Sequence, residues 1–547
     1  METPTGQAAL APVVENERIQ SLDVVRGFAL IGILMMNVEY FNRAISQLGS
    51  GMPAGLSGAN LWVTWFVQYF VVGKFWTIFS LLFGMGFAVM LSRAERAGRS
   101  FLVPYLRRIA ALAVFGALHS ILLWSGDILF SYAVGAAALL IVLYGRPKWI
   151  VAAMVLCIGG AFIPGMNWLG GVAGGLAFFS LAGWWLRGEQ RLKRFGRPPV
   201  IGVVLLVCGA IALIAGVVMW FLPNTPREAR VGLPLLSIAL LALGYLTNRF
   251  HDDQPARPWR LGVGIYCFSF FMMTAAGASM YFFPEKPAAV VSKAEAKKLQ
   301  ERAAERAKNL KERKERIEKE TKVLTTGTYA QGVAMRAERF AQHAPGEVGF
   351  ATILIGMFLI GTWFVRAGIM DNARAHLPLF RKLATIGLPL GIGLGLLGST
   401  IAVRSVPGAN GADGWQLASG LQMLGNLPAS LGYASLVILM LHSASVFNKV
   451  SILAPFGRMA LTNYLSQSLI ASIYFFGYGF GHWGVSRVDQ MLFVAVVVVL
   501  QIAFSHFWLA RFRYGPMEWL WRAITYWTIP PMRIAKQAPL APAEMPA

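Results

Sequence analysis

One histidine in this sequence has a carboxylate close enough to make it a general base. His119 lies near the end of an apolar run, GALHSILLWSGDILFSYA, and Asp127 follows in a very short turn. A carboxylate that hydrogen-bonds an imidazole fixes its tautomer and raises its basicity, so the pair could take a proton from a hydroxyl or an amine. The alternative is a histidine that only makes interhelical hydrogen bonds, with Asp127 capping the next helix.

Two further polar side chains are expected near the same end of neighbouring apolar runs. Asn37 follows the start of the first run by about three helical turns. Lys74 opens the second run, GKFWTIFSLLFGMGF, which has a small-residue packing face at Ser80, Gly84 and Gly86. Lys74 could steer an anionic or carbonyl-bearing group, or it could simply snorkel to the membrane surface.

The opposite end of the same runs carries a second polar group. Asp23 and Arg26 stand three residues apart on one helix face, where they can pair, and Gly27 lets another helix approach closely. Far along the chain, PFGRMALTNYLSQSLI brings three polar side chains to related faces: Arg458, Asn463 and Gln467. Polar groups at membrane depth usually face a cavity or a partner, so these residues are site candidates. The alternative is an anchoring ion pair with interhelical hydrogen bonds.

A short amphipathic helix is predicted after the last apolar run. In FRYGPMEWLWRAITY, Glu518 and Arg522 are four residues apart, and Trp519 and Trp521 suit a membrane interface. This pattern predicts a docked interfacial helix with one surface salt bridge.

The composition shows that helices in a membrane must position these residues. Of the 547 residues, 56% are hydrophobic and only 14% are charged, and the mean hydropathy is +0.56. Ordinary soluble domains are about a quarter charged. The net charge of +23 would suit a nucleic-acid binder only on a wettable surface, which this chain largely lacks. The sequence therefore predicts an all-α integral membrane protein and no nucleic-acid partner.

Fourteen stretches are candidates for crossing the membrane, since a spanning helix needs about 20 mostly apolar residues. A pair of short stretches, 149–165 and 168–186, could instead be re-entrant, so we expect eleven to fourteen transmembrane helices. The candidates are 27–45, 74–91, 106–124, 128–144, 149–165, 168–186, 199–221, 232–248, 261–283, 349–366, 384–403, 427–446, 459–478 and 491–510.

Basic loops predict the orientation, because cytoplasmic loops are enriched in Lys and Arg. Loops 92–108 and 187–198 each carry five basic residues, and four arginines follow the last span. Loops 222–226 and 479–486 contain no Lys or Arg. The alternation predicts both termini in the cytoplasm.

Residues 285–340 form a charged segment unlike the rest of the chain. Ion pairs at helical spacing predict a helix, and an apolar residue recurs every seven positions, although the partner heptad positions are poor. A solvated single helix is favoured over a coiled coil. It is expected outside the cytoplasmic membrane, where it could mediate homo-oligomerisation or bind a partner.

Metal and nucleotide motifs receive no support. Cys157, Cys208 and Cys267 lie in apolar runs without ligand spacing, and no P-loop, GxSxG or HExxH is present. We therefore expect no metal.

Five ordered blocks resemble the YeiB-like membrane proteins, known as domain of unknown function 418 (DUF418). They are SLDVVRGFALIGILMMNV, GKFWTIFSLLFGMGF, LHSILLWSGDILFSYA, PFGRMALTNYLSQSLI and RYGPMEWLWR. This family is grouped with transmembrane acyltransferases such as heparan-α-glucosaminide N-acetyltransferase, to which the first block is similar through Asp23, Arg26, Gly27 and Asn37. No histidine lies between Asn37 and Lys74, where that enzyme has its catalytic histidine, so His119 is the substitute.

The resemblance implies transfer of an acetyl-type acyl group from cytosolic acyl-CoA to an extracytoplasmic acceptor, a glycan or another envelope molecule, across a bacterial inner membrane. His119 would be the base, Asp127 its orienting partner, and Asn37 or Lys74 would stabilise the oxyanion. The other polar group would bind the CoA phosphates through its arginines: Asp23, Arg26, Arg458, Asn463 and Gln467.

The chain then divides into six regions. These are a cytoplasmic tail (1–22), an N-terminal YeiB-like block (23–145), additional transmembrane helices (146–283), a charged extracytoplasmic insert (284–348), a C-terminal YeiB-like block (349–524) and a flexible cytoplasmic tail (525–547).

Two other functions fit the same residues. A transporter of a small solute or envelope precursor could use the polar side chains as its pathway. A scaffold or sensor could bind a partner through the charged helix.

Overall fold

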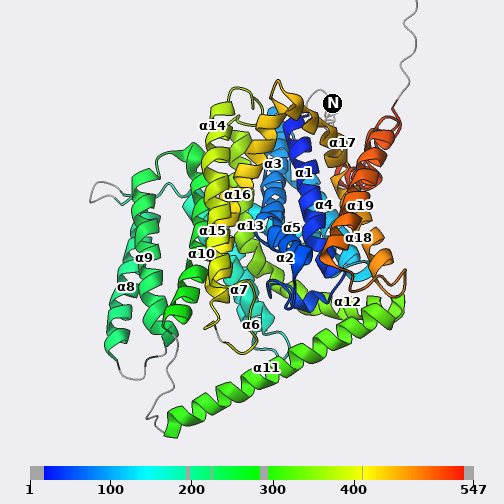
Figure 1. The fold of residues 1–547 in the computed structure, drawn as a ribbon. Coiled ribbons are helices and arrows are strands. Elements are labelled where there is room, and N and C mark those ends of the chain that lie inside the picture. Colours follow the sequence, from blue (N-terminus) through cyan, green and yellow to red (C-terminus); the bar gives the residue numbers. More distant parts are fainter. Residues whose placement is uncertain are drawn as a thin grey trace, which may run out of the picture.

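The computed structural model is a bundle of helices (Figure 1) and describes residues 18–192, 198–222, 225, 227–283, 293–409 and 411–534. Within these ranges no β-strand forms, and extended backbone pairs only at isolated bridges. The predicted all-α fold is confirmed. Parts of the two predicted tails, 1–17 and 535–547, lie outside the described residues.

Twenty α-helices follow one another along the described chain. Their bounds are α1 Gln20–Asn37, α2 Gly58–Phe66, α3 Lys74–Arg96, α4 Leu102–Leu122, α5 Leu129–Tyr144, α6 Pro147–Gly160, α7 Trp168–Arg187, α8 Val200–Phe221, α9 Arg227–Phe250, α10 Arg257–Phe282, α11 Lys293–Thr326, α12 Tyr329–His343, α13 Glu347–Arg366, α14 Leu377–Lys382, α15 Leu388–Ile401, α16 Trp415–Leu441, α17 Leu453–Arg458, α18 Ala460–Phe475, α19 Arg487–Leu509 and α20 Pro516–Tyr526.

Eleven helical segments among the described residues are long and apolar enough to cross a membrane, and α5 and α6 are shorter apolar helices. The count agrees with the predicted eleven to fourteen. Each predicted span contains a helix, but α16 begins at Trp415, well before the predicted 427. The start of α16 carries Gln422 and Asn426, which are buried inside the protein. Hydropathy misses the first turns of this helix because it scores polar side chains as though they faced lipid.

Glycines allow the central helices to pack closely. A Cβ on Gly84 of α3 would lie 2.2 Å from the Phe358 carbonyl oxygen of α13, and one on Gly361 would lie 2.0 Å from the Leu81 oxygen. A Cβ on Gly27 of α1 would lie 2.3 Å from the Leu453 oxygen of α17. The predicted close approaches at Gly27 and Gly84 are therefore confirmed.

Helix α11 crosses one end of the bundle as a long strap (Figure 1). It is a single helix, as predicted, but one of its sides is not solvated. Glu320 is buried and accepts hydrogen bonds from the Ile45 nitrogen at 2.8 Å and the Ser46 hydroxyl at 2.6 Å. Two turns earlier in α11, Arg313 donates a hydrogen bond to the Ser50 hydroxyl at 2.6 Å. These contacts fasten α11 to the loop that follows α1.

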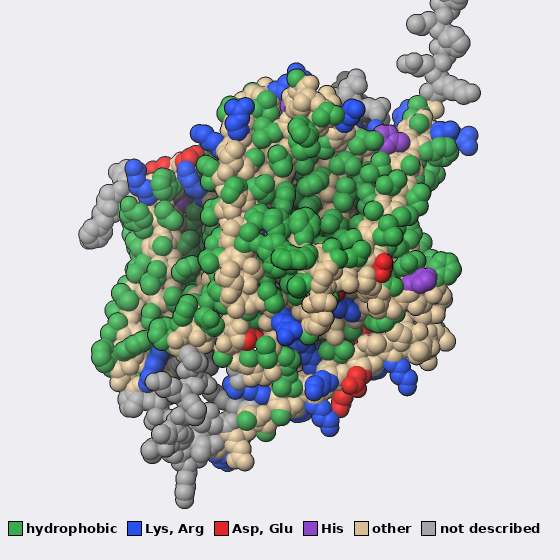
Figure 2. Space-filling model, viewed as in Figure 1, with side chains coloured by type: hydrophobic (Ala, Val, Ile, Leu, Met, Phe, Trp, Pro, Cys, Tyr) green, Lys and Arg blue, Asp and Glu red, His purple; other side chains and the backbone are tan. Residues whose placement is uncertain are grey.

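The two ends of the bundle are polar and the middle is apolar. In Figure 2 hydrophobic side chains cover the middle, while Lys and Arg gather towards the two ends. We call the end that α11 crosses the α11 face. We call the opposite end the arginine-rich face, defined by Arg18, Arg93, Arg108, Arg458 and Arg522. Helix α20 lies at the arginine-rich face (Figure 1), and residues 527–534 fold back from it, with Arg513 nitrogen donating to the Met532 oxygen at 2.9 Å. The predicted flexible tail from 525 thus contains an ordered first part.

Candidate functional site

A cavity of about 290 Å³ enters the bundle from the arginine-rich face. It lies among α1, α3, α4, α5, α17, α18 and α20, so both ends of the chain contribute walls. Six arginines line it, against two carboxylates, a formal excess of four positive charges. The arginines are Arg18, Arg26, Arg93, Arg108, Arg458 and Arg522.

Both carboxylates of the cavity already have partners. The predicted pair is confirmed, because Arg26 Nη1 lies 2.7 Å from Asp23 Oδ1. Glu518 accepts hydrogen bonds from the Leu461 nitrogen at 2.6 Å and from the Thr462 hydroxyl at 2.6 Å. The carboxylate therefore caps the start of α18, and the predicted surface salt bridge with Arg522 is wrong. Burial raises the pKa of Glu518 above its ordinary value.

The arginines at the mouth are crowded together. Burial lowers the pKa of Arg18 first, and the positive charge of Arg458 lowers it further. Burial likewise lowers the pKa of Arg522, and the positive charge of nearby Arg108 lowers it further. Arginine stays charged even so, and clustered positive charge of this kind favours an anion. The mouth is suited to phosphate or carboxylate groups.

A wider hollow of about 770 Å³ adjoins this mouth. It shares Ile19, Val89 and Arg93 with the cavity and adds further basic side chains between α3 and the loop after α13: Arg96, Arg99 and Arg366. Arg366 is paired with Glu95 at 3.3 Å. A ligand with several anionic groups could occupy both spaces at once.

Deeper in the bundle the cavity becomes apolar. Its walls include Phe79, Leu82 and Leu112, and it ends at Ile128, Leu129, Tyr132 and Tyr464. Gly86 of α3 also lines it, and a Cβ there would meet no atom within 4 Å. The shape suits a long ligand with an anionic head and a less polar arm.

The predicted histidine–carboxylate pair is confirmed at the end of this cavity. His119 Nδ1 lies 2.7 Å from Asp127 Oδ1, and both side chains are buried. Asp127 Oδ2 accepts a hydrogen bond from the Phe130 nitrogen at 2.8 Å, so the carboxylate also caps the start of α5. His119 Nε2 is buried and has no hydrogen-bond partner among the described residues. The rings of His119 and Tyr464 lie 5.1 Å apart, which links the pair to the cavity wall.

Asn37 and Lys74 lie away from the cavity. Neither lines the arginine-lined cavity or the wider hollow beside it. Lys74 is fully buried rather than snorkelling, and its amine donates to the Val72 oxygen at 3.2 Å. Its own carbonyl accepts a hydrogen bond from Ser430 of α16 at 2.8 Å. Their predicted part in the chemistry stays a prediction.

Only Arg458 of the three candidates in the PFGRMALTNYLSQSLI block lines the cavity. Asn463 donates to the Phe456 oxygen at 3.0 Å and to the Ser505 hydroxyl at 3.1 Å. Gln467 donates to Gln501 at 3.0 Å. These amides connect α18 with α17 and α19, which is an interhelical role rather than a ligand contact in this structure.

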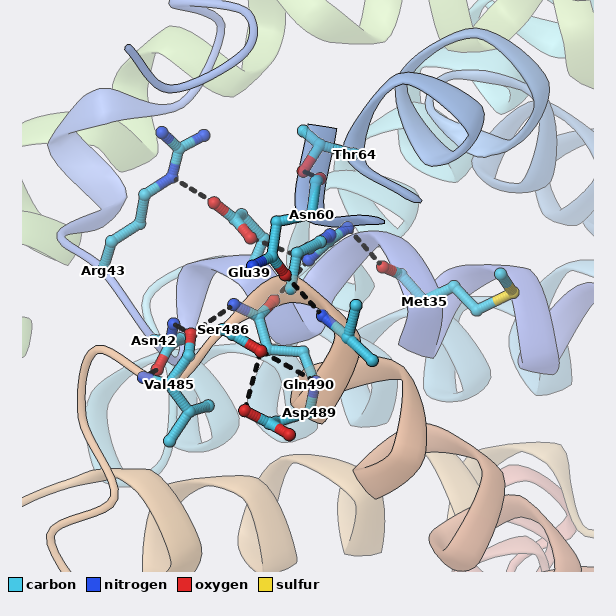
Figure 3. A network of polar contacts seen from close by, with 12 residues as sticks. Met35, Glu39, Asn42, Arg43, Asn60, Thr64, Val485, Ser486, Asp489 and Gln490 are labelled. Atoms are coloured by element: carbon cyan, nitrogen blue, oxygen red, sulfur yellow. Dashed lines mark hydrogen bonds and ion pairs between the residues drawn. The ribbon is translucent and has the colours of Figure 1, made fainter. Parts of the chain in front are cut away.

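A second arginine cluster lies beside the loop after α1 that α11 contacts, and Figure 3 shows the polar network around it. Arg487 of α19 donates to Glu39 at 2.7 Å and to the Met35 oxygen at 3.1 Å, and it also contacts Gln490. Arg43 lies 3.0 Å from the other oxygen of Glu39. None of these residues lines the cavities described above. The network joins the end of α1 to the start of α19.

Four cavity arginines were not among the predicted site residues: Arg18, Arg93, Arg108 and Arg522. Arg93, Arg108 and Arg522 were interpreted as a topology signal, and Arg18 lies in the predicted cytoplasmic tail. Tyr464 and Glu518 were likewise missed, although both lie in the quoted blocks. Among the described residues no group of three or more His, Cys, Asp or Glu side chains could hold a metal ion.

The fold and the cavity together define a polytopic α-helical membrane protein with an arginine-lined internal cavity. Residues 364–528 match a family described as a protein of unknown function, DUF418. The chain is 26% identical over 529 residues to the uncharacterized protein YxaH of Bacillus subtilis (strain 168), covering 95% of this chain and 97% of that one. It is 25% identical over 521 residues to the uncharacterized protein YeiB of Escherichia coli (strain K12), covering 93% and 96%.

An uncharacterized 39.9 kDa protein of Bacillus acidopullulyticus is 38% identical over 122 residues, which are 22% of this chain and 33% of that protein. No solved structure matches. The predicted resemblance to the YeiB-like proteins of DUF418 is confirmed by the family match over residues 364–528 and by the similarity to YxaH and YeiB along nearly the whole chain.

Proposed function

We propose that this protein is a bacterial inner-membrane acyltransferase that takes an acetyl-type group from acyl-CoA. The arginine-rich face would be cytoplasmic, as the loop charges predict, with both termini on that side. The acceptor, a glycan or another envelope molecule, would bind from the α11 face. The observation that supports this most is the cavity itself, which connects a cationic mouth to the neighbourhood of a buried His119–Asp127 pair.

The mouth and the adjoining hollow have the chemistry that a CoA donor needs. The donor carries several phosphates at one end, which arginines bind through charge-assisted hydrogen bonds. Its long arm would follow the apolar walls past Gly86 and bring the thioester close to Tyr464. Asp23 and Glu518 would not repel the phosphates strongly, since each is already hydrogen-bonded within the protein.

The chemistry assigns a role to each nitrogen of His119. Nδ1 is held by Asp127, which leaves the unpartnered Nε2 to take a proton from the acceptor hydroxyl or amine. The freed oxygen or nitrogen attacks the thioester carbonyl carbon, and the carbon–sulfur bond breaks as the tetrahedral intermediate collapses. The CoA thiolate leaves and takes the proton from His119. Asn37 and Lys74 would need to move towards the carbonyl to stabilise its oxyanion.

A matched pair of glycine substitutions tests the donor site. Gly86→Leu places a side chain into the cavity, where nothing lies within 4 Å of its Cβ. Gly393→Leu on α15 is the control, because it also meets nothing within 4 Å and is exposed. In nanodiscs, binding of acetyl-CoA should be lost for Gly86→Leu and unchanged for Gly393→Leu. Equal binding by both variants would contradict the donor site.

A transporter is the second candidate, because a smaller cavity lies beyond Asp127, towards the α11 face. Two cavities separated by a thin partition also suit alternating access. Proteoliposomes suspended in a membrane-impermeant thiol-reactive dye, with acetyl-CoA added outside, separate the two functions. An acyltransferase releases CoA thiol on the side where acetyl-CoA was added, whereas a transporter accumulates unmodified substrate inside.

A further inference from the structure

The smaller cavity, of about 40 Å³, lies on the other side of the turn that carries Asp127. Asp127 lines this outer cavity, and the next residue, Ile128, lines the arginine-lined one. Consecutive residues therefore face two separate spaces. A turn one residue thick, and holding the carboxylate that binds His119, separates the cationic cavity from the α11 face.

The outer cavity has a different chemistry from the arginine-lined one. Its polar lining comprises Ser120, Ser125, Asp127, Ser131, Arg339, His343 and Glu347. Arg339 is already engaged, since its Nη1 lies 3.3 Å from Glu320 and donates to the Ser46 hydroxyl at 3.2 Å. Glu347 Oε2 is buried and accepts no hydrogen bond of normal geometry from the described residues. Two carboxylates and three hydroxyls thus face a ligand that donates hydrogen bonds, and they disfavour an anion.

The outer cavity holds only a small group. One water molecule needs about 10–15 Å³ of such space, so a cavity of about 40 Å³ admits a hydroxyl or an amine and few further atoms. The rest of a larger molecule would need the space that α12 now fills. Helix α12 and the turn after it supply Arg339, Phe340, His343 and Ala344 to this cavity.

Helix α12 is attached to the end of α4 by contacts that water could replace. Arg336 donates to the carbonyl oxygens of Ile121 at 2.9 Å and Leu122 at 3.0 Å. The Tyr329 hydroxyl donates to the same Leu122 oxygen at 3.1 Å. Beyond these, the ring of Phe340 meets Phe130 edge-on at 5.0 Å. A positive side chain at a helix C-terminus is favourable, but the carbonyls it satisfies can also bind solvent.

We propose that the outer cavity binds the reacting hydroxyl or amine of a neutral or cationic acceptor, and that α12 is a cover that lifts to admit it. This inference rests on the proposed function, which supplies the reaction of the acceptor, namely acyl transfer. It adds the side of entry, the charge class of the acceptor and the moving element. Sugars with free amines or hydroxyls fit this class, and acidic sugars do not.

Thiol accessibility tests the cover without any acyl-transfer assay. In a variant whose three cysteines are replaced by alanine, Ser131→Cys places a thiol in the outer cavity, and Ser57→Cys is the exposed control. A cationic and an anionic methanethiosulfonate reagent are compared in nanodiscs. Adding Arg336→Ala should speed the Ser131→Cys reaction by about tenfold, since two hydrogen bonds of the cover are lost. The rate at Ser57→Cys should not change.

Tyr329→Phe is the milder second variant, and it should give a smaller acceleration in the same direction. The cationic reagent should react faster than the anionic one at Ser131→Cys, and Glu347→Gln should reduce that preference. Glucosamine should slow labelling and glucuronate should not. Thermal unfolding confirms that each variant is folded.

Two results would overturn the inference. One is that labelling of Ser131→Cys is unaffected by both Arg336→Ala and Tyr329→Phe in folded protein. The other is that the outer cavity shows no charge preference. In that case the anionic reagent reacts as fast as the cationic one, or glucuronate protects as well as glucosamine. Either result leaves acetyl-CoA binding at the arginine-rich face untouched. Loss of CoA binding would instead contradict the proposed function while the accessibility pattern remained.

Discussion

Two clusters of arginine in this protein differ in how their charge is balanced. Arg487 is surrounded by the Met35 carbonyl of α1, the Glu39 carboxylate of the turn after α1, and the Gln490 amide of its own helix α19. Figure 3 shows these three partners. At the arginine-lined cavity, six arginines face two carboxylates. Of these carboxylates, Asp23 is paired with Arg26, and Glu518 accepts hydrogen bonds from the start of α18. The first cluster is complete within the protein, and the second has an excess of positive charge next to open space.

The difference separates a structural use of arginine from a binding use. A buried ion needs hydrogen bonds and opposite charge to offset its desolvation, and Arg487 obtains these from α1 and α19. Arginines that outnumber the carboxylates around them cost stability, which a bound anion can restore. We therefore expect substitutions in the two clusters to affect different measurements.

The largest effect is expected at the inner end of the cavity. His119→Ala should lower acyl transfer by about 10²- to 10⁴-fold, because the general base is lost, while acetyl-CoA affinity stays the same. His482→Ala is the control, since that histidine is exposed and stacks on Tyr474 at 4.5 Å. Turnover is measured as CoA thiol release in the purified, folded protein. Unchanged turnover in His119→Ala would contradict a catalytic role for the inner end of the cavity.

A smaller effect is expected at the mouth. Arg522→Gln should weaken acetyl-CoA binding by about 10- to 100-fold, as expected for one hydrogen bond to a charged group. Arg487→Gln should leave this affinity unchanged and lower the Tm, because it leaves Glu39 buried with one ion-pair partner fewer. Calorimetric titration and thermal unfolding of both variants give the two readouts. The comparison breaks if Arg487→Gln weakens binding as much as Arg522→Gln does.

The smallest effect concerns the pH dependence of stability. Burial raises the pKa of Glu518 in the folded state above its ordinary value of 4.5. The folded state therefore binds the proton more tightly than the unfolded state, so stability falls as pH rises from about 4.5 to the raised pKa. Glu518→Gln cannot ionise, so its Tm should change less across that window. A Tm profile parallel to that of the unsubstituted protein would show that Glu518 contributes nothing to it.

Several site residues could be predicted because their partners are close in the sequence. Asp23 and Arg26 share a helix face, and His119 and Asp127 are joined by one tight turn, so local geometry brings each pair together. The sequence left open whether Asp127 orients His119 or caps the next helix. In the structure one oxygen does each. Asn463 and Gln467 were predicted to bind a ligand, but Ser505 and Gln501 of α19 engage them instead.

Composition and hydropathy by themselves determined the class of protein and nearly all its long apolar helices, because transfer of apolar side chains into lipid depends on local sequence. The short turn between them also placed His119 and Asp127 close enough to meet, while leaving open whether they do. Only the tertiary structure decided which arginines line a cavity and which are neutralised. Arg18, Arg108, Arg458 and Arg522 come from four distant segments, and their convergence depends on helix packing that no single segment encodes. The same packing brings α12, from the charged insert, onto the end of α4 beside His119.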